Sequence, residues 1–174
     1  LEKPYVTTIK LTDHIMVGAT EDVKELTIDR AITLVNGSTD NSRALQLQLP
    51  LTIAEGGALT LDGLEGFVNL YPYNGMVVNG SLTVGAGCEV IFEGDQSFLT
   101  INQGGTVTTQ PAGENTLPGE LSLGQGATLT ASGKLVNNGR FYVSDMENLK
   151  KAADIGGELT LDSMTIDEDY TLDM

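Results

Sequence analysis

Residues suited to binding a sugar gather between Phe67 and Asn74. Phe67, Tyr71 and Tyr73 are three of the nine aromatic residues of the chain, and Asn69 and Asn74 stand among them. Aromatic rings stack on the faces of sugar rings, and asparagine amides hydrogen-bond to sugar hydroxyls. The segment therefore predicts a glycan-binding loop. The plainer alternative is that Phe67 and one tyrosine only pack over the chain beneath them.

Residues 110–119 form a second departure from the surrounding pattern, because two prolines and two glycines fall within this short segment. Such a composition favours a loop. If this loop lies on the same face as the aromatic segment, the two enclose a groove.

Three carboxylates, Glu89, Glu93 and Asp95, lie close together in the sequence. Carboxylate oxygens are ligands for Ca²⁺, so the three residues are a candidate calcium site, and no other cofactor is expected. A carboxylate pair also performs glycoside hydrolysis. The alternative to both is a solvated acidic loop. Neither the paired aspartates nor the Gly-His-Gly sequence of pectin hydrolases occurs in the chain.

The chain has one histidine, His14, and one cysteine, Cys88. A zinc site needs further nitrogen or sulfur ligands, and a serine-type triad needs a histidine near its serine, so neither is expected. Cys88 begins the apolar run 88–92 and is predicted to be a small buried side chain.

Charge excludes several classes of partner. The formal net charge is −15, and no Lys, Arg or His occurs between Ala44 and Gly133. Such a surface repels phosphate backbones and anionic membranes, so nucleic-acid binding is not expected. No segment approaches the roughly 20 apolar residues of a membrane-spanning helix, so membrane insertion is not expected either.

A short unit, Gly-x-apolar-Thr/Ser-apolar, recurs along the chain and must position these residues. It begins at Gly57, Gly80, Gly105, Gly119 and Gly157, with a looser copy at Gly139. The spacing of these glycines is uneven, and it is shortest between Gly105 and Gly119. Recurrence of one short unit indicates a solenoid, and spacings near about 20 residues suit one coil of a β-helix. At about 20 residues a coil, the chain predicts an all-β solenoid of roughly seven or eight irregular coils.

Within the coils, apolar-polar-apolar triplets mark the strands. In an extended chain the outer two side chains point inward and the middle one points to solvent. Glycine pairs at 56–57, 104–105 and 156–157 are predicted corners that need a positive φ. The triplets are 26–28, 32–34, 51–53, 59–61, 82–84, 99–101, 121–123, 141–143 and 159–161.

One short helix is predicted near 144–153. Ser144 followed three positions later by Glu147 forms a capping box, and Gly156 ends the segment. We interpret residues 1–174 as a single β-helix domain. Residues after about 157 resemble residues 9–17, so they either begin a second unit or close the domain as the first strands do.

The residues around this helix resemble a known class of module. Residues 143–152, followed by a glycine pair and Leu159-Thr160-Leu161-Asp162, are similar to the opening of right-handed parallel β-helix modules in large, adhesin-like bacterial cell-surface proteins. In those modules the helix and strand are followed by a segment similar to residues 24–34. The resemblance implies a right-handed parallel, pectate-lyase-like β-helix in a secreted or cell-surface-attached protein.

From this resemblance we expect a non-enzymatic structural spacer or adhesin whose partners are host or cell-wall glycans or a protein. The alternative is a polysaccharide-processing lyase or glycoside hydrolase, active or degenerate, because such enzymes share the fold. A lyase of this kind uses a cationic base, and the stretch from Ala44 to Gly133 contains no cationic side chain.

Overall fold

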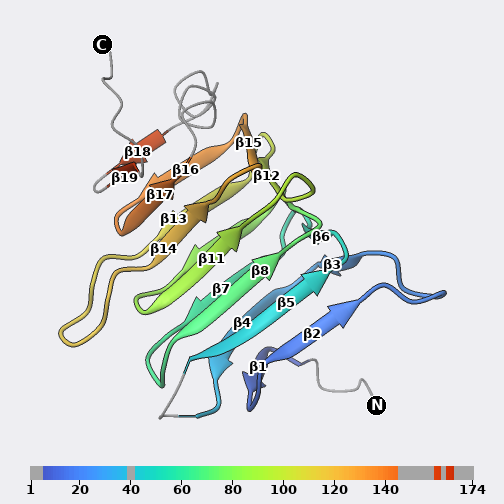
Figure 1. The fold of residues 1–174 in the computed structure, drawn as a ribbon, viewed down its shortest axis with the longest axis horizontal. Helices are drawn as coiled ribbons and strands as arrows, with labels where there is room; N and C mark the ends of the chain where they lie inside the picture. The colour runs from blue at the N-terminus through green and yellow to red at the C-terminus, as the bar shows by residue number, and fades with distance from the viewer. Residues whose placement is uncertain (1–5, 39–41, 145–158, 162–163, 167–174) are drawn as a thin grey trace.

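The computed structural model describes residues 6–38, 42–144, 159–161 and 164–166. The described chain winds as a parallel β-helix in which every third strand returns to the same sheet (Figure 1). Two sheets have seven strands and one has five, and every pairing between the strands is parallel. The predicted all-β fold, a parallel β-helix, is confirmed.

The three sheets are named here A, B and C in the order in which the chain enters them. Sheet A contains β1 (Thr8–Leu11), β4 (Ala31–Asn36), β7 (Ala58–Asp62), β10 (Ser81–Val84), β13 (Thr106–Thr109), β16 (Lys134–Asn137) and β18 (Leu159–Leu161). Sheet B contains β2 (Ile15–Gly18), β5 (Arg43–Gln48), β8 (Val68–Pro72), β11 (Cys88–Phe92), β14 (Glu120–Leu123), β17 (Arg140–Val143) and β19 (Met164–Ile166). Sheet C contains β3 (Leu26–Ile28), β6 (Leu51–Ile53), β9 (Met76–Val78), β12 (Phe98–Ile101) and β15 (Thr128–Ala131).

The coils are longer and fewer than the sequence predicted. Thr33, Thr60, Thr83 and Thr108 are successive register partners in sheet A, so each coil ends where the next threonine is reached. These coils exceed the length of about 20 residues that was expected from the recurring unit. The β-helix therefore has about six coils rather than the seven or eight that were predicted. β18 and β19 extend sheets A and B of this same helix.

The interior is filled mainly by aliphatic side chains, with Phe92 and Phe141 among them. Along β10, Leu82 and Val84 are fully buried while Thr83 faces outward and is half-buried. The same alternation is found in β7 and β12, and all nine predicted triplets lie within strands. The assignment of aliphatic residues to the inside and hydroxyl residues to the outside is confirmed for most of the described strands, and Thr109 and Ser122 are exceptions because both are buried.

The recurring glycines are required by close approach to the preceding coil. A Cβ atom on Gly57 would lie 2.2 Å from the carbonyl oxygen of Ile28, and one on Gly105 would lie 2.2 Å from that of Val78. Their neighbours Gly56 and Gly104 have φ values of 77° and 89°, as predicted for these corners. Each described glycine pair thus combines a left-handed corner with a tight contact.

The described residues contain no helix, and accordingly none that is long and apolar enough to cross a membrane. The helix predicted near 144–153 falls almost entirely on residues 145–158, which lie outside the described part of the chain. The predicted corner at 156–157 lies outside it as well.

Candidate functional site

The aromatic segment predicted to be a loop is largely a strand. Val68–Pro72 forms β8 in sheet B, followed by a turn at 73–75. Phe67, Asn69, Tyr71 and Tyr73 occupy every second position, and side chains alternate across a strand, so all four lie on the outer side of the coil. The loop prediction was wrong, but the strand brings its residues into one row.

The last two residues of the row form an aromatic pair. The rings of Tyr71 and Tyr73 are stacked with their centroids 5.9 Å apart and an interplanar angle of 24°. Both side chains are half-buried. Burial raises the pKa of the Tyr71 hydroxyl, and a hydrogen bond with the Asn69 side chain opposes that rise. Asn69, Tyr71 and Tyr73 therefore form one connected surface on sheet B.

Asn74, the last predicted sugar ligand, has a structural role. Its Nδ2 donates a hydrogen bond to the carbonyl oxygen of Gln48, at 2.9 Å. This bond ties the turn after β8 to the end of β5, and it fixes the loop that carries Tyr73.

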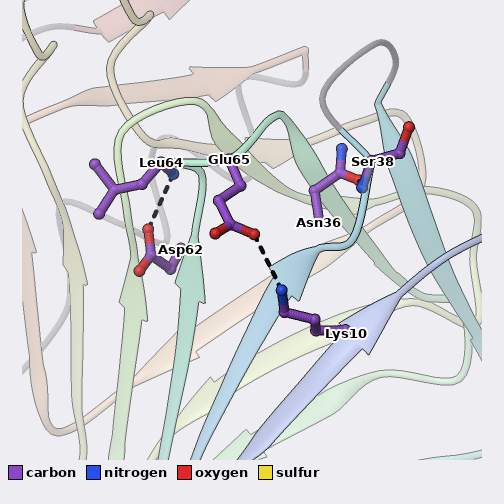
Figure 2. A network of polar contacts seen from close by, with 6 residues as sticks. All are labelled: Lys10, Asn36, Ser38, Asp62, Leu64 and Glu65. Carbon is purple, nitrogen blue, oxygen red and sulfur yellow. Dashed lines mark hydrogen bonds and ion pairs between the residues drawn. The ribbon is translucent and has the colours of Figure 1, made fainter.

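Polar contacts hold the turns at the corner between sheets A and B (Figure 2), and one of them reaches the backbone of Phe67. The buried side chain of Asn36 donates through Nδ2 to the Phe67 carbonyl oxygen at 3.1 Å, and its Oδ1 accepts from the Ser38 amide at 2.8 Å. Asp62 Oδ1 accepts from the Leu64 amide at 3.0 Å. The turn after β7 is thereby held in a shape that places the Phe67 ring outside the coil.

An ion pair between the first and third coils lies in the same region (Figure 2). Lys10 Nζ of β1 lies 3.3 Å from Glu65 Oε2 in the turn between β7 and β8. Both side chains are more than half exposed, so the pair adds little to stability.

A hollow of about 220 Å³ lies beside Phe67, and we call it the corner hollow. The hollow lies at the β10–β11 corner, 85–87, which is shorter than the corners at 63–67 and 110–119 in the neighbouring coils (Figure 1). The Leu117 carbonyl accepts a hydrogen bond from the Gly87 amide at 2.8 Å, which ties the longer loop to the short corner. The lining of the corner hollow includes Ser42, Phe67, Asn69, Glu89, Leu117, Pro118 and Glu120.

The predicted groove between the aromatic segment and residues 110–119 therefore exists at this corner. Phe67 is 45% exposed and Leu117 is 59% exposed, so the hollow has an apolar rim. The Phe67 ring lies over Gly87, where an added Cβ would approach the ring to 3.4 Å. The positive φ of Gly87, 74°, is what favours glycine at this corner.

The polar wall of the hollow is a pair of glutamates. Glu89 of β11 is in register with Asn69 on one side and with Glu120 of β14 on the other. Burial raises the pKa of Glu89 to about 7, and the neighbouring Glu120 adds to that rise through its charge and a hydrogen bond. Glu120 Oε2 also pairs with Arg140 Nη1 at 3.0 Å.

The three carboxylates of the predicted calcium site are not assembled into one. Glu89 faces the hollow, while Glu93 and Asp95 follow β11 and are exposed. Among the described residues no group of three or more His, Cys, Asp or Glu side chains is arranged to hold a metal ion. Glu89 and Glu93 both act electrostatically on Tyr71, so these two lie beside the aromatic row.

Glu120 is the residue of this site that the sequence did not reveal. It lies a full coil after Glu89 in the sequence, and only the register of β11 with β14 makes the two neighbours. Its one signal was its place in the recurring unit that begins at Gly119, where the residue after the glycine faces outward.

The two remaining candidates are structural. His14 Nδ1 accepts a hydrogen bond from the Ala44 amide at 3.1 Å, linking the β1–β2 corner to β5. Cys88 is 2% exposed, and burial raises the pKa of its thiol to about 12. The prediction of a small buried cysteine is confirmed.

Comparison with protein-family models, with curated proteins and with solved structures finds no match to this chain. The proposal for the function of this protein therefore rests on the candidate site itself.

Proposed function

We propose that this β-helix is a non-enzymatic, glycan-binding module of a secreted bacterial surface protein, in which the outer face of sheet B carries the binding site. The observation that carries the proposal is the stacked pair of Tyr71 and Tyr73 in a row with Asn69. Aromatic rings offer apolar faces to sugar rings, and the amide supplies hydrogen bonds that orient the hydroxyls.

The platform supports this proposal because it is rigid. β8 is hydrogen-bonded to β5 and to β11, and its inward side chains, Val68 and Leu70, are fully buried. A preorganised row of side chains loses little conformational entropy when a ligand binds. The stacked coils also form a spacer. The same β-helix thus provides both the length that an adhesin needs and the surface that binds the ligand. The proposal that the protein is secreted and attached to a cell surface is supported only by the resemblance of the sequence to such modules.

A glycan array tests the proposal, with the wild-type protein and Tyr71→Ala and Tyr73→Ala variants. Removing a stacking ring is expected to weaken binding by at least about tenfold, as for other central aromatic contacts. Tyr142→Ala is the matched control, because Tyr142 is a half-buried tyrosine on the same sheet, on β17. Circular dichroism shows that each variant is folded. Absence of any bound glycan, or equal binding by all four proteins, would overturn the proposal.

The raised pKa of Glu89 beside Glu120 favours one second candidate, a glycoside hydrolase in which Glu89 is the general acid. A carboxyl group that keeps its proton near neutral pH can protonate a leaving group. Release of reducing ends from a polysaccharide by the wild-type protein, and loss of that release in Glu89→Gln, would establish the hydrolase. Binding without release supports the module.

A further inference from the structure

The lining of the corner hollow combines two kinds of side chain. The apolar ones are the exposed ring of Phe67 and the exposed side chain of Leu117. The polar ones are the carboxyl groups of Glu89 and Glu120, with the amide of Asn69 next to Glu89 in the register. A ligand that fills the hollow thus meets an aromatic face and an acidic wall together.

The carboxylates of this wall outnumber the cation that faces them. Arg140 pairs with Glu120, and it is also the cation that lowers the pKa of Glu89. The stretch from Ala44 to Gly133, which supplies most of the lining, contains no Lys, Arg or His. When both glutamates are ionised, the hollow keeps one carboxylate in excess of Arg140 and attracts a cation.

We propose that the corner hollow binds a sugar residue that carries a free primary ammonium group. This inference rests on the proposed function, because the amino sugar in the hollow would belong to the glycan whose next ring lies along Asn69 and Tyr71.

Three properties select an ammonium group on a sugar. A cation is attracted to the face of an aromatic ring, and Phe67 offers such a face with no polar atom of its own. An ammonium group donates three hydrogen bonds, which matches the acceptors of two glutamates and one asparagine amide. The volume of about 220 Å³ is below the roughly 300–1,000 Å³ of pockets for drug-sized ligands, so it suits one sugar ring.

The test compares the disaccharide of glucosamine with the disaccharide of N-acetylglucosamine, two probes that differ only in carrying a free amine or an acetamide on each ring. Calorimetric titration at neutral pH and physiological ionic strength measures both affinities. We expect the wild-type protein to prefer the free amine by at least about tenfold. Glu89→Gln should lose this preference, and Phe67→Ala should weaken binding of the amine while Glu89 stays in place.

Glu55→Gln controls for general attraction to an acidic protein. Glu55 is exposed in the turn between β6 and β7, away from the hollow lining, so Glu55→Gln makes the same chemical change at a distant surface position. The Glu55→Gln variant should keep the preference for the free amine.

The outcomes separate this inference from the proposed function. If both disaccharides bind equally and Tyr71→Ala weakens both, the glycan module stands and the amine site is wrong. If neither disaccharide binds while the array shows other glycans bound through Tyr71, the amine site is again wrong. If a lysine-containing peptide binds through Glu89 and glucosamine does not, the hollow is a peptide site and the inference is overturned.

Discussion

Glu89 and Glu120 are direct register partners on the adjacent parallel strands β11 and β14. Partner positions in neighbouring strands are about 4.8 Å apart, so the two carboxyl groups interact strongly. Like charges at this distance disfavour double ionisation, and burial adds to that effect. The outer face of sheet B therefore contains a carboxyl group that exchanges its proton near neutral pH.

Glu89 is predicted to make the folded protein less stable as the pH rises. Its pKa is about 7 in the folded protein against an ordinary value of 4.5, so the folded state holds an extra proton between these values. The free energy of unfolding should fall as pH increases through this window. We expect a loss of about 1 kcal/mol, less than the full shift would give, because solvent screens this partly exposed group.

Urea denaturation of the wild-type protein and Glu89→Gln measures this effect. Glutamine resembles the protonated acid, so the variant should match the wild type near pH 4.5 and exceed its stability near pH 8. Glu55→Gln should follow the wild-type curve. A constant difference between wild type and Glu89→Gln at every pH would contradict the assignment.

Asn36 is predicted to hold the turn that carries Phe67. In Asn36→Ala the Ser38 amide loses its partner in a buried corner, and the Phe67 carbonyl keeps only the hydrogen bond from the Arg43 amide. We expect the free energy of unfolding to fall by about 1–3 kcal/mol. Ser38→Ala is the control, because Ser38 contributes its backbone amide and should change stability by less than about 0.5 kcal/mol. Similar effects of the two substitutions would disprove the role of the Asn36 side chain.

The adjacent glycines of the β6–β7 corner are predicted to respond differently to the same substitution. Gly56 has a positive φ with open space around it, so Gly56→Ala should cost about 1 kcal/mol. Gly57→Ala places a Cβ atom 2.2 Å from the Ile28 carbonyl oxygen, and it should cost about 3 kcal/mol or prevent folding. Chemical denaturation compares the two, and a larger loss for Gly56→Ala would contradict this account of the corner.

Cys88 is predicted to be unreactive in the folded protein. Its thiol is buried and its pKa of about 12 leaves little thiolate at neutral pH. A thiol reagent should label the native protein at least about 100-fold more slowly than the urea-unfolded chain. Comparable rates in the two states would mean that the β10–β11 corner opens readily.

Much of the fold could be predicted from local sequence, because alternation of side chains is a local property. The triplet Leu82-Thr83-Val84 needs only its own extended backbone to bury two side chains and expose one. The glycines could also be recognised, since an added Cβ at Gly57 and at Gly119 would meet a carbonyl oxygen at the same 2.2 Å.

The length of a coil could not be predicted, because the same unit serves two corners. Gly57, Gly80 and Gly105 precede strands of sheet A, whereas Gly119 and Gly139 precede strands of sheet B. The short gap between Gly105 and Gly119 is thus the step from one sheet to the next rather than a short coil. Both corners face the same steric problem, so the local residues do not distinguish them.

Only part of the candidate site could be predicted from the sequence, for a related reason. Phe67, Asn69, Tyr71 and Tyr73 are neighbours in sequence, but Glu89 and Glu120 join them only through the register between coils. The register of Glu89 with Glu120 depends on the length of the loop at 110–119, and that of Glu89 with Asn69 depends on the chain between β8 and β11. No pattern within a strand reports either register.

The most direct test of the proposed glycan site is nuclear magnetic resonance of protein labelled on its five tyrosines. An oligosaccharide selected on the array is titrated into the labelled protein. The ring signals of Tyr71 and Tyr73 are predicted to shift together while that of Tyr142 stays in place. Shifts at Tyr142 alone, or no tyrosine shift while the sugar is bound, would contradict a binding site on this part of sheet B.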